Sequence, residues 1–242
     1  LADQMLVGGE SLTRNLGFGL RAASALGGAA MIGYCPDTFG HSADLPRILR
    51  GYNIDNAVVW RGVPPLASSP FFYWRSPDGS QVLGNLLARG YYQTAFSENV
   101  DVEKLASYML GFLGLELKPA YISEKAEPGF TYSNDLGSAL LPVGGDHLAP
   151  PLHFSERLAA ASAAIKSRVR QPLASIDRDT FVSPEQIEFE ATSLEGYIDE
   201  ARRSILTDLH ALALVEGELR ENSNFHCVFV GTRARENVRL LT

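Results

Sequence analysis

A short apolar run followed by a proline-containing turn constrains the fold of this chain more than any other stretch. Residues 28–34 are mostly apolar and bounded by glycines, as in a buried strand. Residues 43–49 read as the beginning of a helix, with Ser42 as its cap. Asp37 is therefore expected where a parallel strand ends, the edge at which α/β proteins place their chemistry. One Asp in a turn is more often a capping residue, so this loop alone does not predict catalysis.

The composition is that of a globular protein of one or two domains. The 242 residues are 45% apolar and 20% charged, which is enough apolar material for a sizeable core. The formal net charge of −7 argues against a nucleic-acid partner, whose phosphates require a basic surface. No run of about 18 apolar residues occurs, so no membrane span is expected. A neutral polar ligand such as a sugar is compatible with this balance.

Cysteine usage gives a mild indication of the compartment. Cys35 and Cys227 are too few for a disulfide scaffold or a cysteine-rich zinc site, and both are expected to be reduced. That favours a cytoplasmic setting. The chain begins at Leu1 and opens directly on a motif, so we expect it to be a fragment whose N-terminal part is missing.

Helical and strand patterns alternate over the first 62 residues, which predicts an α/β fold with a mainly parallel sheet. Helices are expected at 11–25, 42–52, 102–115 and 155–169. Strands are expected at 56–60, 71–75, 81–87 and 140–143, the second and third joined by a turn. From residue 183 helical spacing continues to about 214, and 231–242 reads as the beginning of another helix.

Several further stretches keep a fixed order around the Asp37 loop. They are residues 1–16, PDTFGH at 36–41, the strand region 51–62, GGDH at 144–147 and EGELR at 216–220. Together they resemble glycoside hydrolase family 38, the retaining, zinc-dependent α-mannosidases. The resemblance implies a mainly parallel, seven-stranded β/α barrel-like catalytic domain over residues 1–182. It also implies that residues 183–242 begin the central helical domain.

The resemblance assigns chemistry to particular residues. A retaining glycosidase holds two carboxyl groups about 5–5.5 Å apart, one as nucleophile and one as general acid/base. The resemblance makes Asp37 the nucleophile and Asp146 the acid/base. Many relatives carry two adjacent acids at the second position, whereas Gly145 precedes Asp146 here and leaves one candidate. The residues expected to contact the sugar are Arg61, Tyr91, Tyr92 and His147.

The resemblance also implies one zinc ion with Asp37 as a ligand. The family uses in addition a His and an Asp of an N-terminal His-x-Asp motif and a His of a later His-Asp motif, and neither motif occurs in this chain. We therefore expect the remaining ligands outside these residues, and the 242 residues alone to be inactive. His41 is expected to order its own loop rather than to bind metal.

Two other functions stay open beside the α-mannosidase. A carbohydrate-binding module that has lost its metal site would account for the missing ligands. A metal-dependent carbohydrate deacetylase uses a related barrel, but it needs an Asp with a His-x-x-x-His pair, and only His41 and His147 are available. The expected partner is a mannose-containing oligosaccharide or glycoside, and a homo-oligomer is left open.

Overall fold

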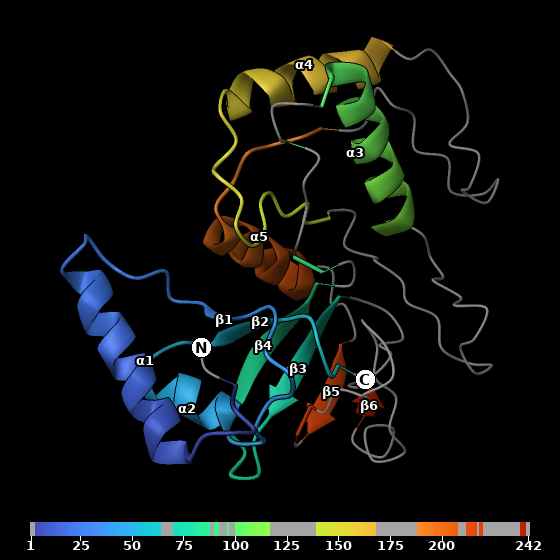
Figure 1. Ribbon diagram of the computed structural model, residues 1–242. Coiled ribbons are helices and arrows are strands. Elements are labelled where there is room, and N and C mark those ends of the chain that lie inside the picture. The colour runs from blue at the N-terminus through green and yellow to red at the C-terminus, as the bar shows by residue number, and fades with distance from the viewer. Residues whose placement is uncertain are drawn as a thin grey trace.

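A mixed β-sheet forms the centre of the molecule (Figure 1). The computed structural model describes residues 3–63, 70–87, 90–91, 96, 100–116, 139–167, 188–207, 212–216, 218–219 and 238–240. Within them the sheet has six strands in the order β1-β2-β4-β3-β5-β6. The strands are β1 Gly33–Cys35, β2 Asn56–Val59, β3 Phe71–Arg75, β4 Gln81–Leu86, β5 Ala213–Glu216 and β6 Val238–Leu240.

The strand directions divide the sheet into two parts. β1, β2 and β4 run parallel to one another. β3 returns antiparallel to β4 through the turn at 76–80, β5 runs parallel to β3, and β6 is antiparallel to β5. The sheet is therefore α/β but mixed rather than mainly parallel. A closed seven-stranded barrel and a helical bundle after it stay predictions.

Five helices occur in the described part of the chain. They are α1 Gly9–Ser24, α2 Leu45–Gly51, α3 Val102–Glu116, α4 Phe154–Ser167 and α5 Leu194–Thr207. The first four confirm the helices expected from hydrophobic spacing, with ends that differ by a few residues. No helix in the described ranges is both long and apolar enough to cross a membrane.

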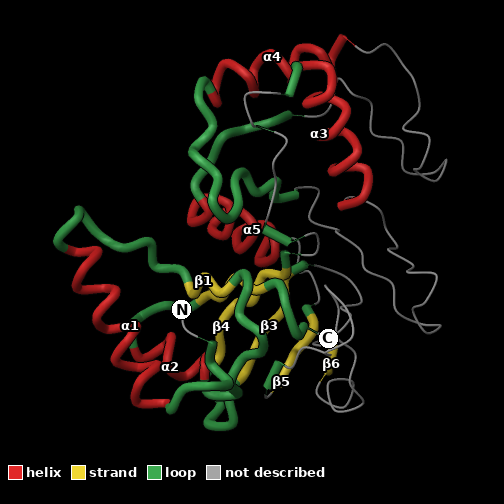
Figure 2. The backbone as a smooth tube through the Cα atoms, viewed as in Figure 1, coloured by secondary structure: helices red, strands yellow, loops and turns green. Residues whose placement is uncertain are grey.

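The sheet is covered on both faces, because its strands send alternate side chains to opposite sides. Ala57 and Val59 of β2 join a core that contains residues of α1 and α2. Val58, between them, belongs to a second core built against α5. Figure 2 shows the strands between α1 and α2 on one side and α5 on the other. Strand β2 is buried at all four positions, which agrees with the apolar residues 57–59 that follow Asn56.

A third core lies away from the sheet. Helices α3 and α4 pack together around Leu105, Met109 and Ile165, all fully buried. Figure 1 shows this pair beyond α5, so α5 stands between the helix pair and the sheet. The strand ends described below therefore belong to the sheet and lie apart from the α3–α4 pair.

Three expected elements differ from the structure. Residues 140–143 form no strand, because Leu140 packs against the α5 core and Leu141 against the α3–α4 core instead of pairing with a neighbour. The helix expected to reach residue 214 ends at Thr207, and Ala213–Glu216 form β5 beside β3. Val238–Leu240 form β6 where a helix was expected. The domain boundary at 182/183 stays a prediction, although β5 joins the sheet of the preceding segment.

Candidate active site

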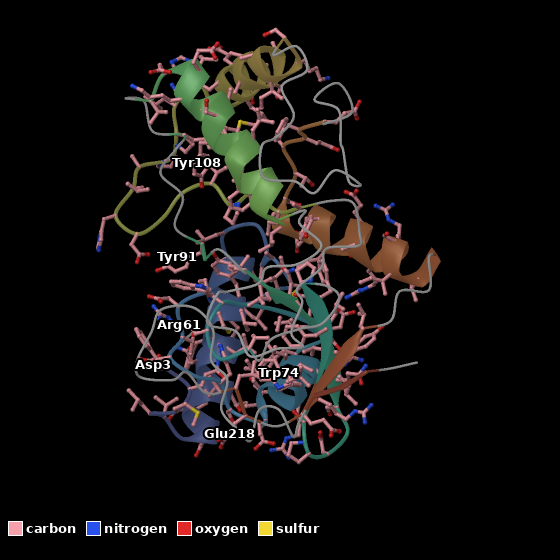
Figure 3. All side chains as sticks on the ribbon, turned by 90° about the vertical axis from the view of Figure 1, so that its right-hand side faces the viewer. Asp3, Arg61, Trp74, Tyr91, Tyr108 and Glu218 are labelled. Carbon is pink, nitrogen blue, oxygen red and sulfur yellow. The ribbon has the colours of Figure 1, made fainter. Side chains whose placement is uncertain are left out.

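Three side chains of the expected site follow the ends of three adjacent parallel strands. Asp37 comes just after β1, Arg61 just after β2, and Tyr91 a few residues after β4. Parallel strands end at the same edge of a sheet, so the topology brings these residues together. Figure 3 shows Tyr91 and Arg61 on one side of the sheet region, with Trp74 farther inside.

Arg61 binds the carboxylate of Asp37. Its Nε donates to Oδ1 of Asp37 at 2.7 Å, and a terminal guanidinium nitrogen donates to the same oxygen. The side chain of Arg61 is only 8% exposed, whereas that of Asp37 is 40% exposed. The guanidinium is therefore a fixed, buried support for a carboxylate that still reaches solvent. Arg61 holds Oδ1 and does not hold Oδ2 of Asp37.

Two aromatic rings fix the guanidinium of Arg61. Its central carbon lies 4.2 Å from the centre of the Phe39 ring and 4.4 Å from that of Trp60. Planar guanidinium groups stack well on aromatic faces, and such cation–π contacts contribute about 0.5–2 kcal/mol each. The stacking restricts the direction from which Arg61 can approach Asp37.

Tyr91 joins the second carboxylate to the first. Its hydroxyl donates a hydrogen bond to Oδ2 of Asp146 at 2.8 Å. Desolvation raises the pKa of Tyr91, and the neighbouring carboxylates of Asp146 and Asp37 raise it further. The hydroxyl therefore lies near both carboxylates and stays a proton donor at neutral pH. Its ring meets Trp60 edge-on, with 5.6 Å between the ring centres.

The segment that carries Asp146 is a turn rather than a strand end. Gly144 and His147 adopt positive φ angles of 121° and 60°, so the chain bends on both sides of Asp146. Asp146 is exposed, and its charge also raises the pKa of Tyr34, after the larger effect of burial. Asp146 thus sits among two tyrosines, one from β1 and one following β4.

His41 has a structural environment, which agrees with the expectation that it orders its own loop. It is fully buried, its backbone pairs with Leu219, and its ring meets Trp74 edge-on. Burial lowers the pKa of His41 to about 4, although the neighbouring backbone of Arg61 and the charge of Asp3 act in the opposite direction. His41 is therefore neutral at physiological pH.

The other residues expected at the sugar have different outcomes. His147 is exposed and makes no hydrogen bond or ion pair with any residue that the structure describes. Tyr92 lies outside the described residues. Sequence reasoning overlooked Phe39 as the second ring that stacks on Arg61. The sequence feature that could have indicated this contact is the position of Phe39 between the candidate nucleophile Asp37 and the turn glycine Gly40.

The described residues do not by themselves form a zinc site. Among them no three His, Cys, Asp or Glu side chains gather as a metal-binding group. A structural zinc needs four protein ligands and a catalytic zinc usually three, whereas Asp37 supplies a single carboxylate, whose Oδ1 Arg61 already binds.

Residues 1–116 match the model of the glycosyl hydrolases family 38 N-terminal domain. This stretch contains the loop of Asp37, all three parallel strands and Arg61. Residues 1–116, just under half of the chain, are therefore similar to the N-terminal domain of glycosyl hydrolase family 38. The match ends before Asp146, so the role of that residue does not follow from it.

Relatives and a solved structure agree with the family. A protein of Halalkalibacterium halodurans, named as a candidate mannosylglycerate hydrolase, is 40% identical over 104 residues, which are 38% of this chain and 12% of that protein. The alpha-mannosidase of Saccharomyces cerevisiae is 34% identical over 109 residues, 43% of this chain and 10% of that protein. The matched part of this chain thus spans about a tenth of its relatives' length.

A solved structure has a similar fold. An alpha-mannosidase structure from Enterococcus faecalis superposes with a TM-score of 0.61 at 22% sequence identity, covering 90% of this chain and 21% of that one. At this identity the similarity shows the fold alone.

Proposed function

We propose that this chain is part of a family 38 enzyme and carries part of the active site of a retaining α-mannosidase, with Asp37 as nucleophile and Asp146 as general acid/base. One observation supports the proposal. The hydroxyl of Tyr91 donates to Asp146, and it lies close enough to Asp37 that the Asp37 charge raises the pKa of Tyr91. Retaining glycoside hydrolysis requires two carboxyl groups about 5–5.5 Å apart. A single hydroxyl near both carboxylates supports such a pair.

The first chemical step forms a bond between Asp37 and the sugar. Oδ2 of Asp37, the oxygen that Arg61 does not hold, attacks the anomeric carbon, and the bond from that carbon to the leaving oxygen breaks. The leaving oxygen takes its proton from Asp146. The products are a glycosyl ester on Asp37, the released alcohol and an ionised Asp146.

The second step returns the enzyme to its starting state. Ionised Asp146 removes a proton from water, whose oxygen attacks the anomeric carbon as the ester bond to Asp37 breaks. The sugar leaves with its original anomeric configuration, because each step inverts the carbon once. Asp146 is again protonated and Asp37 is again a carboxylate.

Neighbouring side chains would hold both carboxyl groups in place. Arg61 anchors Oδ1 of the Asp37 carboxylate through two bonds to that oxygen. Tyr91 donates to Oδ2 of Asp146, so the transferable proton belongs on Oδ1. The hydroxyl bond persists in both protonation states of Asp146, because Oδ2 accepts in each. Such preorganisation removes reorganisation from the barrier.

The names of the relatives support the proposed substrate class. Two are named alpha-mannosidases and one is named for mannosylglycerate, so a terminal mannosyl group is the shared part of the substrate. The relative with 40% identity favours a second candidate, in which the leaving group is a small acid rather than another sugar. Parallel assays on mannosylglycerate and on mannose disaccharides would separate the two.

Zinc is a further part of this proposal and rests on the family resemblance. We propose that Asp37 supplies one ligand and that the others lie outside the residues described here. Metal analysis of the complete, unmodified protein should find about one zinc per chain. A metal-free protein that retains mannose binding but no hydrolysis would support the carbohydrate-binding module instead.

Two substitutions in the complete protein test the pair of carboxyl groups. Asp37→Ala should abolish turnover, since it removes the nucleophile, and should weaken zinc binding. Asp146→Asn should leave zinc in place and slow substrates with poor leaving groups most, because activated aryl leaving groups need little protonation. Equal losses on both substrate types would contradict Asp146 as the acid, and an ordered site with the two carboxyl groups well beyond about 10 Å apart would rule out their pairing.

A further inference from the structure

Gln4 lies beneath the loop that carries Asp37. Its side chain is almost fully buried, at 4% exposure, although it precedes α1 in a part of the chain that is mostly exposed. Burying a polar carboxamide is unfavourable unless its hydrogen bonds are made. Every side-chain hydrogen bond of Gln4 to a residue that the structure describes goes to this one loop, some thirty residues further along the chain.

The carboxamide bridges the two ends of the loop. Its Nε2 lies 3.6 Å from Sγ of Cys35, the last residue of β1, and 3.3 Å from Nδ1 of His41. Its Oε1 accepts from the backbone N–H of Ser42 at 3.2 Å. Asp37 lies between these anchor points. One side chain therefore ties the strand before Asp37 to the turn after it.

The bond to Ser42 fixes the chemistry of the other contacts. A backbone N–H can only donate, so Oε1 must face Ser42 and the NH₂ group must face His41. Nδ1 of His41 must then be an acceptor, which requires a neutral ring with its proton on Nε2. The buried position of His41 favours the same neutral form.

The preceding residue supports the middle of the loop. Oδ1 of Asp3 accepts from the backbone N–H of Phe39 at 3.1 Å. Figure 3 shows Asp3 on the same side of the molecule as Arg61. Phe39 in turn stacks on Arg61, which holds Asp37. Asp3 and Gln4 thus reach the loop at its centre and at both ends.

We propose that Gln4 is a positioning residue for the nucleophile of the reaction proposed above: it sets the path of the loop from Cys35 to Ser42 and thereby the attack geometry of Asp37. The inference rests on that proposed function for its catalytic consequence only. The contacts themselves predict that removing the carboxamide releases the loop locally, while the strand and the pairing of His41 with Leu219 persist.

Amide hydrogen exchange tests the local effect without any activity. In Gln4→Met, which keeps the length and loses the polar atoms, the exchange rate of the Ser42 amide should rise by about tenfold or more. The amide of His41 donates to the Leu219 carbonyl at 2.7 Å and should keep its protection, which makes it an internal control. Loss of both protections, or of neither, would overturn the positioning role.

The ring of His41 gives a second structural readout. Selective ¹⁵N labelling of the five histidines should show His41 in the wild type with an unprotonated Nδ1. In Gln4→Glu one carboxylate oxygen still accepts from the Ser42 amide, but the other oxygen, also an acceptor, replaces the NH₂ group that faces His41. Nδ1 of His41 should therefore become protonated so that it can donate to this oxygen. An unchanged His41 ring in Gln4→Glu would contradict the bond to Gln4. In both the wild type and Gln4→Glu, the charge of Asp3 also raises the pKa of His41.

Kinetics on an aryl α-mannoside in the complete protein test the catalytic consequence. Gln4→Met should lower kcat by about tenfold to a hundredfold, while KM stays nearly constant, because the nucleophile is misplaced and sugar contacts are not. Gln4→Glu should recover part of kcat through its bond to Ser42. Asp55→Asn is the control: it breaks an ion pair with Arg202 on α5 and should cost stability without lowering kcat.

The outcomes separate the two proposals. If the unmodified protein hydrolyses no α-mannoside, the proposed function fails, and the exchange and ring measurements still decide whether Gln4 holds the loop. If the wild type is active and Gln4→Met keeps the same kcat, the positioning role is wrong. It is equally wrong if Asp55→Asn lowers kcat as much as Gln4→Met does.

Discussion

Arg61 donates twice to a single oxygen of Asp37, from Nε and from a terminal nitrogen. This geometry differs from the fork in which each nitrogen binds its own carboxylate oxygen. It secures the carboxylate at one end and leaves the direction of Oδ2 to other neighbours. The stacking of Arg61 between Phe39 and Trp60 makes that arrangement rigid.

Replacing Arg61 with Lys should therefore impair the proposed reaction although the charge is kept. A lysine ammonium is a point charge that neither stacks as a plane nor donates from two fixed positions. We expect kcat/KM on an aryl α-mannoside to fall by about tenfold to a hundredfold, or about 1.4–2.7 kcal/mol. Arg75→Lys, at an ion pair of 3.5 Å with Glu216, is the matched control and should change kcat/KM little.

Tyr91→Phe should slow substrates with poor leaving groups more than activated ones. The change removes the bond to Asp146 but keeps the ring that packs on Trp60. We expect a loss of about tenfold in kcat on a disaccharide and a smaller loss on an activated aryl glycoside. The pKa of Tyr91 is raised above its ordinary value, so any alkaline limb in the pH–rate profile should persist in Tyr91→Phe. Disappearance of that limb would assign it to Tyr91.

Gly84→Ala should destabilise the sheet. A Cβ at Gly84 would come within 2.4 Å of the Phe72 ring, which lies across it on the neighbouring strand. We expect the free energy of unfolding to fall by about 1–3 kcal/mol, as for an overpacked core. Gly51→Ala is the control, since a Cβ there meets nothing within 4 Å. Denaturant titration of both variants gives the comparison, and equal effects would contradict the clash.

The ion pair between Asp55 and Arg202 should make stability depend on acid pH. Although burial acts against it, bonds from Arg202 lower the pKa of Asp55, so the folded state holds its proton less tightly than the unfolded chain. The stabilisation by this ion pair is complete above about pH 4, which is the pKa of the Asp55 carboxyl in the unfolded chain. It is lost as the pH falls through the lower pKa of the same carboxyl in the folded protein. In Asp55→Asn, unfolding between about pH 2 and 7 should lack this component. Arg202→Met should remove it as well. The contribution should be below about 1 kcal/mol because the pair is partly exposed.

Local patterns predicted the elements whose stability is decided locally. The apolar spacing of α1 and the turn between β3 and β4 were both readable, and so was the position of Asp37 at a strand end. Strand β5 was not, because residues up to 214 continue a helical spacing that started in α5, and pairing with β3 outweighs that propensity. Leu140 and Leu141 were read as a strand because a short apolar run looks the same when it packs against two cores.

The site was predictable only in part, because local patterns place the strand ends but not the contacts between loops. The strand ends placed Asp37 and Arg61, but the bond between them depends on two loops that no periodicity describes. Gln4 gives no sequence signal for its role, since a single polar residue before a helix is usually solvated. Its burial becomes visible only when the loop from Cys35 to Ser42 folds over it. Tyr91 was expected to touch sugar, and its bond to Asp146 is a tertiary contact of the same kind.

The position of β5 in the sheet has a consequence for synthesis on the ribosome. Strands β1 to β4 all lie before residue 87, whereas the strand that covers β3 begins at residue 213. At about 5–20 residues per second, the ribosome needs roughly 6–25 seconds to make the intervening chain. For that time the outer edge of β3 presents unpaired backbone groups, which can template pairing with another nascent chain. Slower translation would lengthen that exposure, so the yield of folded protein should depend on elongation rate even though the finished sheet leaves β3 covered.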